Sequence, residues 1–196
     1  MKSIHFKILG IVLLALTLTT AVMAETQKVD VTKSKLEWTG KKLTGQHNGT
    51  VDIQEGKLEM ENGKITGGNI VMNMQSLKVV DLTDAESNAK LVNHLKSDDF
   101  FSVARHSTAT LDITMVEGTT TNYTVTGNLT IKGITQPVTF TATSSKEGKN
   151  TIYIGSIPVD RSKFDVRFGS KSFFNDLGDK YINDEFILDF HLVTQS

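Results

Sequence analysis

The feature that most constrains this chain is a strict alternation of apolar and polar residues. In residues 123–131, apolar residues and glycine alternate with threonine and asparagine, and the same period of two returns at 138–143. A period of two directs successive side chains to opposite faces of a strand, so the apolar set is expected to face a core. Between the runs, Gly133 can take positive φ, and Pro137 has no backbone donor and belongs at a strand start or edge. The sequence therefore predicts an antiparallel hairpin with one apolar face.

Similar alternation elsewhere predicts about eight strands, separated mostly by turns. The pair Asn62-Gly63 lies between two alternating runs, and this pair strongly favours a two-residue hairpin turn. The clearest strand is Asp184–Thr194, where apolar residues alternate with charged and polar ones. We expect it to close the sheet by pairing with the first strand, Val29–Lys42.

One segment, residues 79–99, does not alternate. Leu91, Val92 and Leu95 follow helical spacing, and Thr83 or Asp84 can cap the helix start. We expect one short helix that plugs or flanks one end of the sheet. Short strands joined by turns favour an all-β antiparallel sandwich or barrel over βαβ units. Periodicity does not distinguish an eight-stranded barrel filled by its own side chains from one that holds a small ligand.

The first 24 residues have the pattern of a secretory signal peptide. Lys2 and Lys7 form a basic start that precedes a short apolar run. Val22 and Ala24 are small residues at the positions that a signal peptidase reads. We expect cleavage after Ala24, which leaves residues 25–196 as one domain; the alternative is an N-terminal membrane anchor. The chain has no cysteine, so the exported domain must be stabilised by its core without disulfides.

Composition excludes some partners. The net charge is −1 and the Lys and Arg residues are scattered, whereas nucleic-acid binding needs a clustered basic face. Phenylalanine accounts for 10 aromatic residues, against 3 tyrosines and 1 tryptophan. Because Phe has no polar group, this bias suits a dry interior.

Three motifs are similar to those of the YceI-like family of bacterial periplasmic proteins. GNLTIKGITQPVTF at 127–140 resembles the family's signature hairpin, HLKSDDFF at 94–101 its H-L-x-S-x-D-F-F segment, and DRSKF at 160–164 its D-R-S-x-F element. His106-Ser107 departs from the family's usual Tyr-Pro. The resemblance implies a lipocalin-like barrel that binds a polyisoprenoid or another long-chain lipid in the periplasm. We expect Asp160 and Arg161 to pair or to brace the loop after them.

Inward apolar residues are candidates for the wall of a lipid site. Trp38, the single Trp, is expected to close the barrel floor or to contact ligand. His47, in a G-x-H-x-G turn, is either a turn histidine bonded to backbone or a polar group at the mouth of a cavity. The candidates for the wall are Trp38, Leu129, Ile131, Phe140, Phe186 and Phe190, and those nearer the openings are Phe100, Phe101 and Phe164.

No catalytic or metal-binding set is recognisable in the sequence. The histidines are scattered without metal-site spacing, and no nucleophile motif is present. We therefore predict a non-catalytic carrier without metal or cofactor. The alternative is a hydrolase or isomerase that acts on such a lipid through Asp98, Asp160 or a histidine at the mouth. The sequence leaves homodimerisation open and predicts no membrane span in the mature chain.

Overall fold

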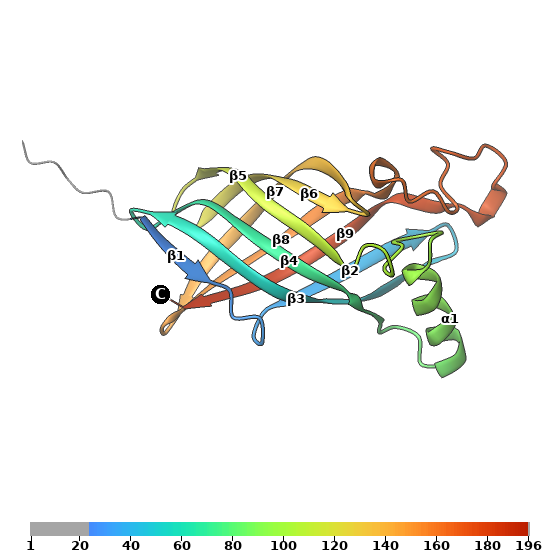
Figure 1. The fold of residues 1–196 in the computed structure, drawn as a ribbon, viewed down its shortest axis with the longest axis horizontal. Coiled ribbons are helices and arrows are strands. Elements are labelled where there is room, and N and C mark those ends of the chain that lie inside the picture. The colour runs from blue at the N-terminus through green and yellow to red at the C-terminus, as the bar shows by residue number, and fades with distance from the viewer. Residues whose placement is uncertain (1–23, 196) are drawn as a thin grey trace, which may run out of the picture.

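The computed structural model describes residues 24–195, which form one antiparallel sheet closed on itself with one α-helix beyond an end (Figure 1). The predicted signal peptide, residues 1–24, lies outside the described residues except for Ala24. Within residues 24–195, no helix is long and apolar enough to cross a membrane.

The elements follow one another in a simple order. The strands are β1 (Ala24–Lys28), β2 (Lys35–Lys42), β3 (Gly45–Glu61), β4 (Lys64–Val79), β5 (Thr108–Gly118), β6 (Asn122–Ile131), β7 (Ile134–Glu147), β8 (Asn150–Asp160) and β9 (Ile182–Gln195). The helical elements are α1 (Ala85–Lys96) and the 3-10 turns η1 (Arg161–Phe164) and η2 (Gly178–Lys180).

The strands form an up-and-down barrel. Each strand from β2 to β8 pairs with the next, and β9 returns to pair with β2. β1 and β2 lie along the same edge of β3, where β1 pairs with residues 57–61 and β2 with residues 45–50. The nine strands therefore occupy eight positions around the barrel. This confirms the predicted antiparallel barrel of about eight strands with one short helix.

The predicted turns are present. Asn62 and Gly63 have φ of 52° and 77°, and Lys132 and Gly133 have φ of 53° and 74°. Two residues at positive φ give the turn whose twist suits a two-residue hairpin. Pro137 lies where β7 is paired with β6 only, because the pairing of β7 with β8 covers residues 141–147. Pro137 is thus at a local edge, as predicted.

The two barrel ends differ. Around one end, here called the helix end, lie the β2–β3 turn, α1, the β6–β7 turn and the loop 165–181 (Figure 1). Asp84 caps α1 by accepting a hydrogen bond from the Ser87 backbone N–H at 2.8 Å, which confirms one of the two predicted caps. The opposite end carries the start of β1 and the β3–β4 turn (Figure 1).

Candidate functional site

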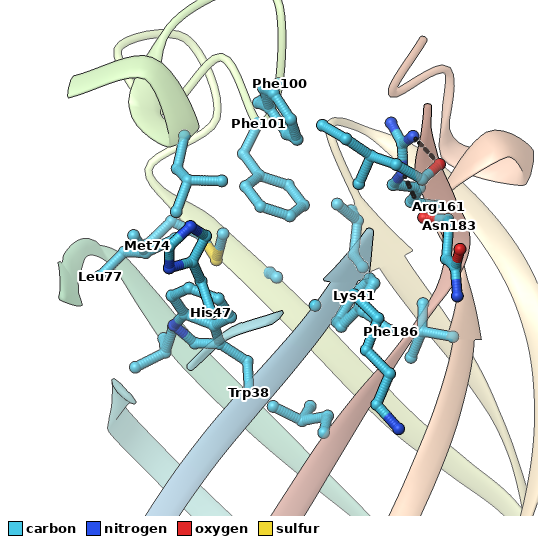
Figure 2. Close-up of a pocket in the computed structure, with 18 of the residues that line it drawn as sticks. Trp38, Lys41, His47, Met74, Leu77, Phe100, Phe101, Arg161, Asn183 and Phe186 are labelled. Carbon is cyan, nitrogen blue, oxygen red and sulfur yellow. Dashed lines mark hydrogen bonds between the residues drawn. The ribbon is translucent and has the colours of Figure 1, made fainter. Parts of the chain in front are cut away.

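A large cavity opens at the helix end of the barrel. This outer chamber has a cavity volume of about 140 Å³. Leu91 and Leu95 of α1, together with Phe100 and Phe101, form its roof. Figure 2 shows the Phe101 ring pointing into the cavity, and its centroid lies 6.3 Å from that of Phe186 on β9. The outer chamber is therefore an apolar space covered by the helix and by aromatic side chains.

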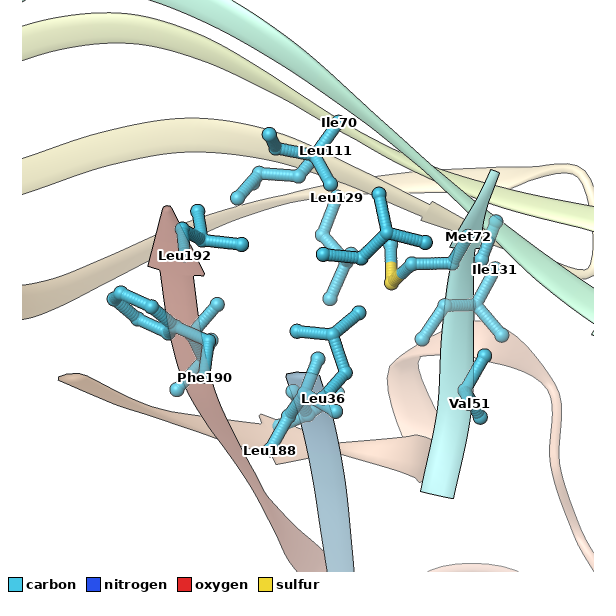
Figure 3. Close-up of a cluster of buried hydrophobic side chains, with 14 of the residues drawn as sticks. Leu36, Val51, Ile70, Met72, Leu111, Leu129, Ile131, Leu188, Phe190 and Leu192 are labelled. Atoms are coloured by element: carbon cyan, nitrogen blue, oxygen red, sulfur yellow. The ribbon is translucent and has the colours of Figure 1, made fainter. Parts of the chain in front are cut away.

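A second cavity lies deeper in the barrel. This inner chamber has a cavity volume of about 50 Å³ and is lined by the apolar parts of aliphatic and aromatic side chains. Met72, Leu129 and Leu188 line both chambers. Figure 3 shows Leu129 and Met72 between Phe190 and Ile131. The two chambers thus adjoin at the level of the three shared residues, and together they extend far along the barrel.

The structure brings most of the predicted site residues to these chambers. Phe164 is the exception, because it is 1% exposed and lines neither chamber. It belongs to the hydrophobic core. The outer chamber contains Trp38, His47, Phe100, Phe101, Leu129, Ile131 and Phe186, and the inner chamber contains Phe140, Phe190 and again Leu129.

Trp38 lies on the outer-chamber wall and not at the barrel floor. Its indole Nε1 donates a hydrogen bond to the backbone oxygen of Lys78 at 3.2 Å. Its ring covers Gly49, where an added Cβ would lie 2.7 Å from the indole. Gly49 is therefore needed for the close approach of Trp38 to the end of β4.

His47 is in β3, and its side chain bonds to a carboxylate and not to the backbone. Its Nδ1 lies 2.8 Å from Oδ2 of Asp81, and Oδ1 of Asp81 accepts a hydrogen bond from the Asn48 backbone N–H at 3.1 Å. Burial disfavours ionised Asp81, but hydrogen bonds from His47 and Asn48 outweigh burial and hold the pKa of Asp81 below its ordinary value. His47 thus ties β3 to the segment that leads into α1.

Arg161 braces the loop after it, as predicted, but its ion pair is not with Asp160. The guanidinium is buried and donates hydrogen bonds to four backbone carbonyl oxygens, and one nitrogen lies 3.4 Å from Oδ1 of Asp184. The four carbonyls belong to Val166, Phe168, Ile182 and Asn183, at 2.8–3.0 Å. Asp160 instead caps η1 by accepting a hydrogen bond from the Ser162 backbone N–H at 3.0 Å. Arg161 therefore fixes the loop 165–181 to the start of β9.

Sequence reasoning missed part of the rim. Lys41, Lys42 and Asn183 are exposed and line the outer chamber, so the chamber reaches solvent beside them. Nothing in the pattern of β2 distinguishes these lysines from ordinary surface residues. Among residues 24–195 there is also no cluster of three His, Asp or Glu side chains placed to hold a metal ion.

Residues 27–194, nearly the whole of the described barrel, match the family model of the YceI-like domain. The chain belongs to the YceI-like family. This confirms the resemblance found in the motifs. The UPF0312 protein of Azotobacter vinelandii is 33% identical over 103 residues, covering 52% of this chain and 51% of that protein. A UPF0312 protein of Yersinia enterocolitica is 37% identical over 82 residues, covering 42% and 39%. These alignments span about half or less of each relative's length.

Solved structures share the fold. The crystal structure of BcnA from Burkholderia cenocepacia is 25% identical, with a TM-score of 0.69, over 84% of this chain and 98% of that one. A polyisoprenoid binding domain from Saccharophagus degradans, implicated in plant cell wall breakdown, is 13% identical, with a TM-score of 0.63, over 87% and 98%. The second likeness concerns the fold alone.

Proposed function

We propose that this YceI-like protein is a non-catalytic periplasmic carrier that holds an isoprenoid or another long-chain amphiphile inside the barrel. The observation that carries the proposal is the apolar lining that runs through both chambers and is joined at Met72, Leu129 and Leu188. Ligand sites of this kind are mostly hydrophobic, with a few polar groups where the ligand emerges. The polar part of the lining lies in the outer chamber, at the helix end.

The chemistry of a hydrocarbon tail fits these chambers. A tail has no hydrogen-bonding group, so it leaves no unpaired polar atom when it enters a dry wall. Burial gains roughly 25 cal/mol per Å² of apolar surface. The polyisoprenoid binding domain that shares this fold supports the same ligand class.

The alternative, an enzyme that acts on such a lipid, receives less support. Asp98 accepts a hydrogen bond from Ser102 and pairs with Arg105 at 3.0 Å. Asp160 caps η1, and neither carboxylate lines a chamber.

The periplasmic location rests on the predicted signal peptide. Mass spectrometry of the exported protein should find Glu25 at its N-terminus, and an intact Met1 would contradict that location.

The test of the proposal is Leu129→Glu, which places a charge where the chambers meet. It should abolish lipid uptake, because a carboxylate there would be buried against the tail. Thr130→Glu is the matched control on the same strand, since the Thr130 hydroxyl bonds to that of Thr135 on the opposite face. Lipid bound after purification is measured by mass spectrometry of an organic extract, and folding by urea melts.

The result that would refute the proposal is a folded Leu129→Glu protein that still carries lipid. If Leu129→Glu does not fold, the wild-type extract decides. An extract that lacks any long-chain lipid, together with no uptake of added lipid, would refute the carrier function.

A further inference from the structure

Several large apolar side chains are exposed at the helix end of the barrel, next to the opening of the outer chamber. Phe173 is 40% exposed and Phe174 48%, both in the loop 165–181, and Leu43 at the β2–β3 turn is 56% exposed. Isolated exposed apolar residues are ordinary, but adjacent ones next to a cavity mouth mark an interaction site. Figure 1 shows that this loop projects beyond the barrel.

The two phenylalanines are held outward by an anchored loop. The backbone N–H groups of Phe173 and Phe174 both donate to the carbonyl of Ser170, at 3.2 and 3.0 Å, and Ser170 is fully buried. The Ser172 hydroxyl donates to Oδ2 of Asp184 at 2.7 Å. The loop therefore has a fixed backbone that presents both rings to solvent.

The loop and the turn adjoin the opening of the chamber. Lys42 pairs with Ile182 in the β2–β9 ladder, so the β2–β3 turn lies beside the end of the loop 165–181. Both residues line the outer chamber. A lipid that leaves the chamber beside Lys42 would thus emerge next to the exposed apolar side chains.

The charge on this side of the opening is positive. Residues 41–44, which are the end of β2 and the β2–β3 turn, and the loop 165–181 together carry five Lys or Arg and three Asp. The segment 80–107, which contains α1, carries three Lys or Arg and five Asp or Glu. Within residues 24–195, Lys41 and Lys42 have no ion pair. Lysines beside apolar side chains suit a surface of anionic lipid head groups.

We infer that the loop 165–181 and the β2–β3 turn form a membrane-contact face, by which the protein rests on an anionic bilayer with its chamber open toward the lipid. Phe173, Phe174 and Leu43 enter the head-group region, and Lys41 and Lys42 face the anionic groups. The inference rests on the proposed carrier function, because such a contact lets a tail pass between bilayer and chamber without crossing water.

The experiment is flotation of the full chain with vesicles of phosphatidylcholine alone and of phosphatidylcholine mixed with phosphatidylglycerol. The protein should float with the mixed vesicles, and the double variant Phe173→Ser, Phe174→Ser should reduce the partition coefficient at least tenfold. The matched control is Met115→Ser, Ile154→Ser, which removes two side chains that are 49% and 51% exposed on the barrel side. It should float as the wild type does. Binding of dodecanoic acid, followed by Trp38 fluorescence, should be unchanged in both double variants.

Three results would overturn the inference. The first is the absence of wild-type flotation, and the second is an equal loss of flotation in both double variants. The third is a Phe173, Phe174 variant that floats as the wild type does but changes its oligomeric state on sedimentation. That result would assign the face to a second copy of the chain. Wild-type flotation that depends on Phe173 and Phe174 but occurs without dodecanoic acid binding would support the membrane contact and contradict the carrier function.

Discussion

Phe190→Ala tests the register of the barrel against a magnitude that the structure supplies. The Phe190 side chain is 7% exposed, and its ring meets Phe140 edge-on with centroids 5.6 Å apart. A buried Phe removes at least about 150 Å² from water, which at about 25 cal/mol per Å² gives roughly 4 kcal/mol. The ring pair adds about 1 kcal/mol. Because Phe190 borders the inner chamber, packing is lost on one side only, and we expect a loss of about 3–4 kcal/mol in unfolding free energy.

The control is the next residue in β9. His191 lies on the other face of the strand, and its buried Nδ1 has no hydrogen-bond partner among the described residues. His191→Ala should therefore cost under about 0.5 kcal/mol. Urea melts of both variants measure the difference in unfolding free energy. Equal losses would refute the reasoning, because a slip of one residue exchanges the two faces of a strand.

Three further predictions follow from local geometry. Gly49→Ala would place Cβ 1.8 Å from the Lys78 carbonyl oxygen, whereas nothing lies within 4 Å of a Cβ at Gly40; in thermal melts Gly49→Ala should lose over about 3 kcal/mol and Gly40→Ala under about 1. Burial raises the pKa of Tyr153 to about 12, so the folded state keeps the phenol proton up to a higher pH than the unfolded state does. Stability should then fall as pH rises above about 10, and Tyr153→Phe should remove that part of the fall in urea melts. The lowered pKa of Asp81 contributes stability that is lost below about pH 4, so the hydrogen-exchange protection factors of the α1 amides should fall there in the wild type and should already be low at neutral pH in Asp81→Asn.

The barrel could be predicted from the sequence because its determinants are local. Alternation assigns each side chain to one of two faces, and the buried Leu188 and Phe190 of β9 lie on the predicted face. The turns at Asn62-Gly63 and Lys132-Gly133 depend on residues that tolerate positive φ. The cap of α1 depends on one side chain three residues from its backbone partner. Each of these features is decided within a few residues of chain.

Depth along the barrel axis could not be predicted in the same way. A period of two gives the face of a residue but not its height, which depends on the stagger of neighbouring strands. The sequence therefore could not decide whether Trp38 lies at the barrel floor or on the wall of a ligand site, or whether the Phe164 side chain lines a chamber or belongs to the core. The partner of Arg161 was missed for a similar reason, because Asp184 approaches only when η1 packs beside the start of β9.

The mouth of the chamber departs most from sequence expectation. The hydrogen bonds at the mouth join residues 40 and 34 positions apart, Trp38 to Lys78 of β4 and His47 to Asp81 before α1. No local pattern encodes them. The bias toward Phe suggested a dry interior, yet Phe173 and Phe174 are exposed on an anchored loop. Where local preference and fold disagree in this way, the disagreement tends to fall at functional sites. Polar residues in place of Phe173 and Phe174 would cost the core nothing. A partner surface therefore explains these two exposed rings better than packing does.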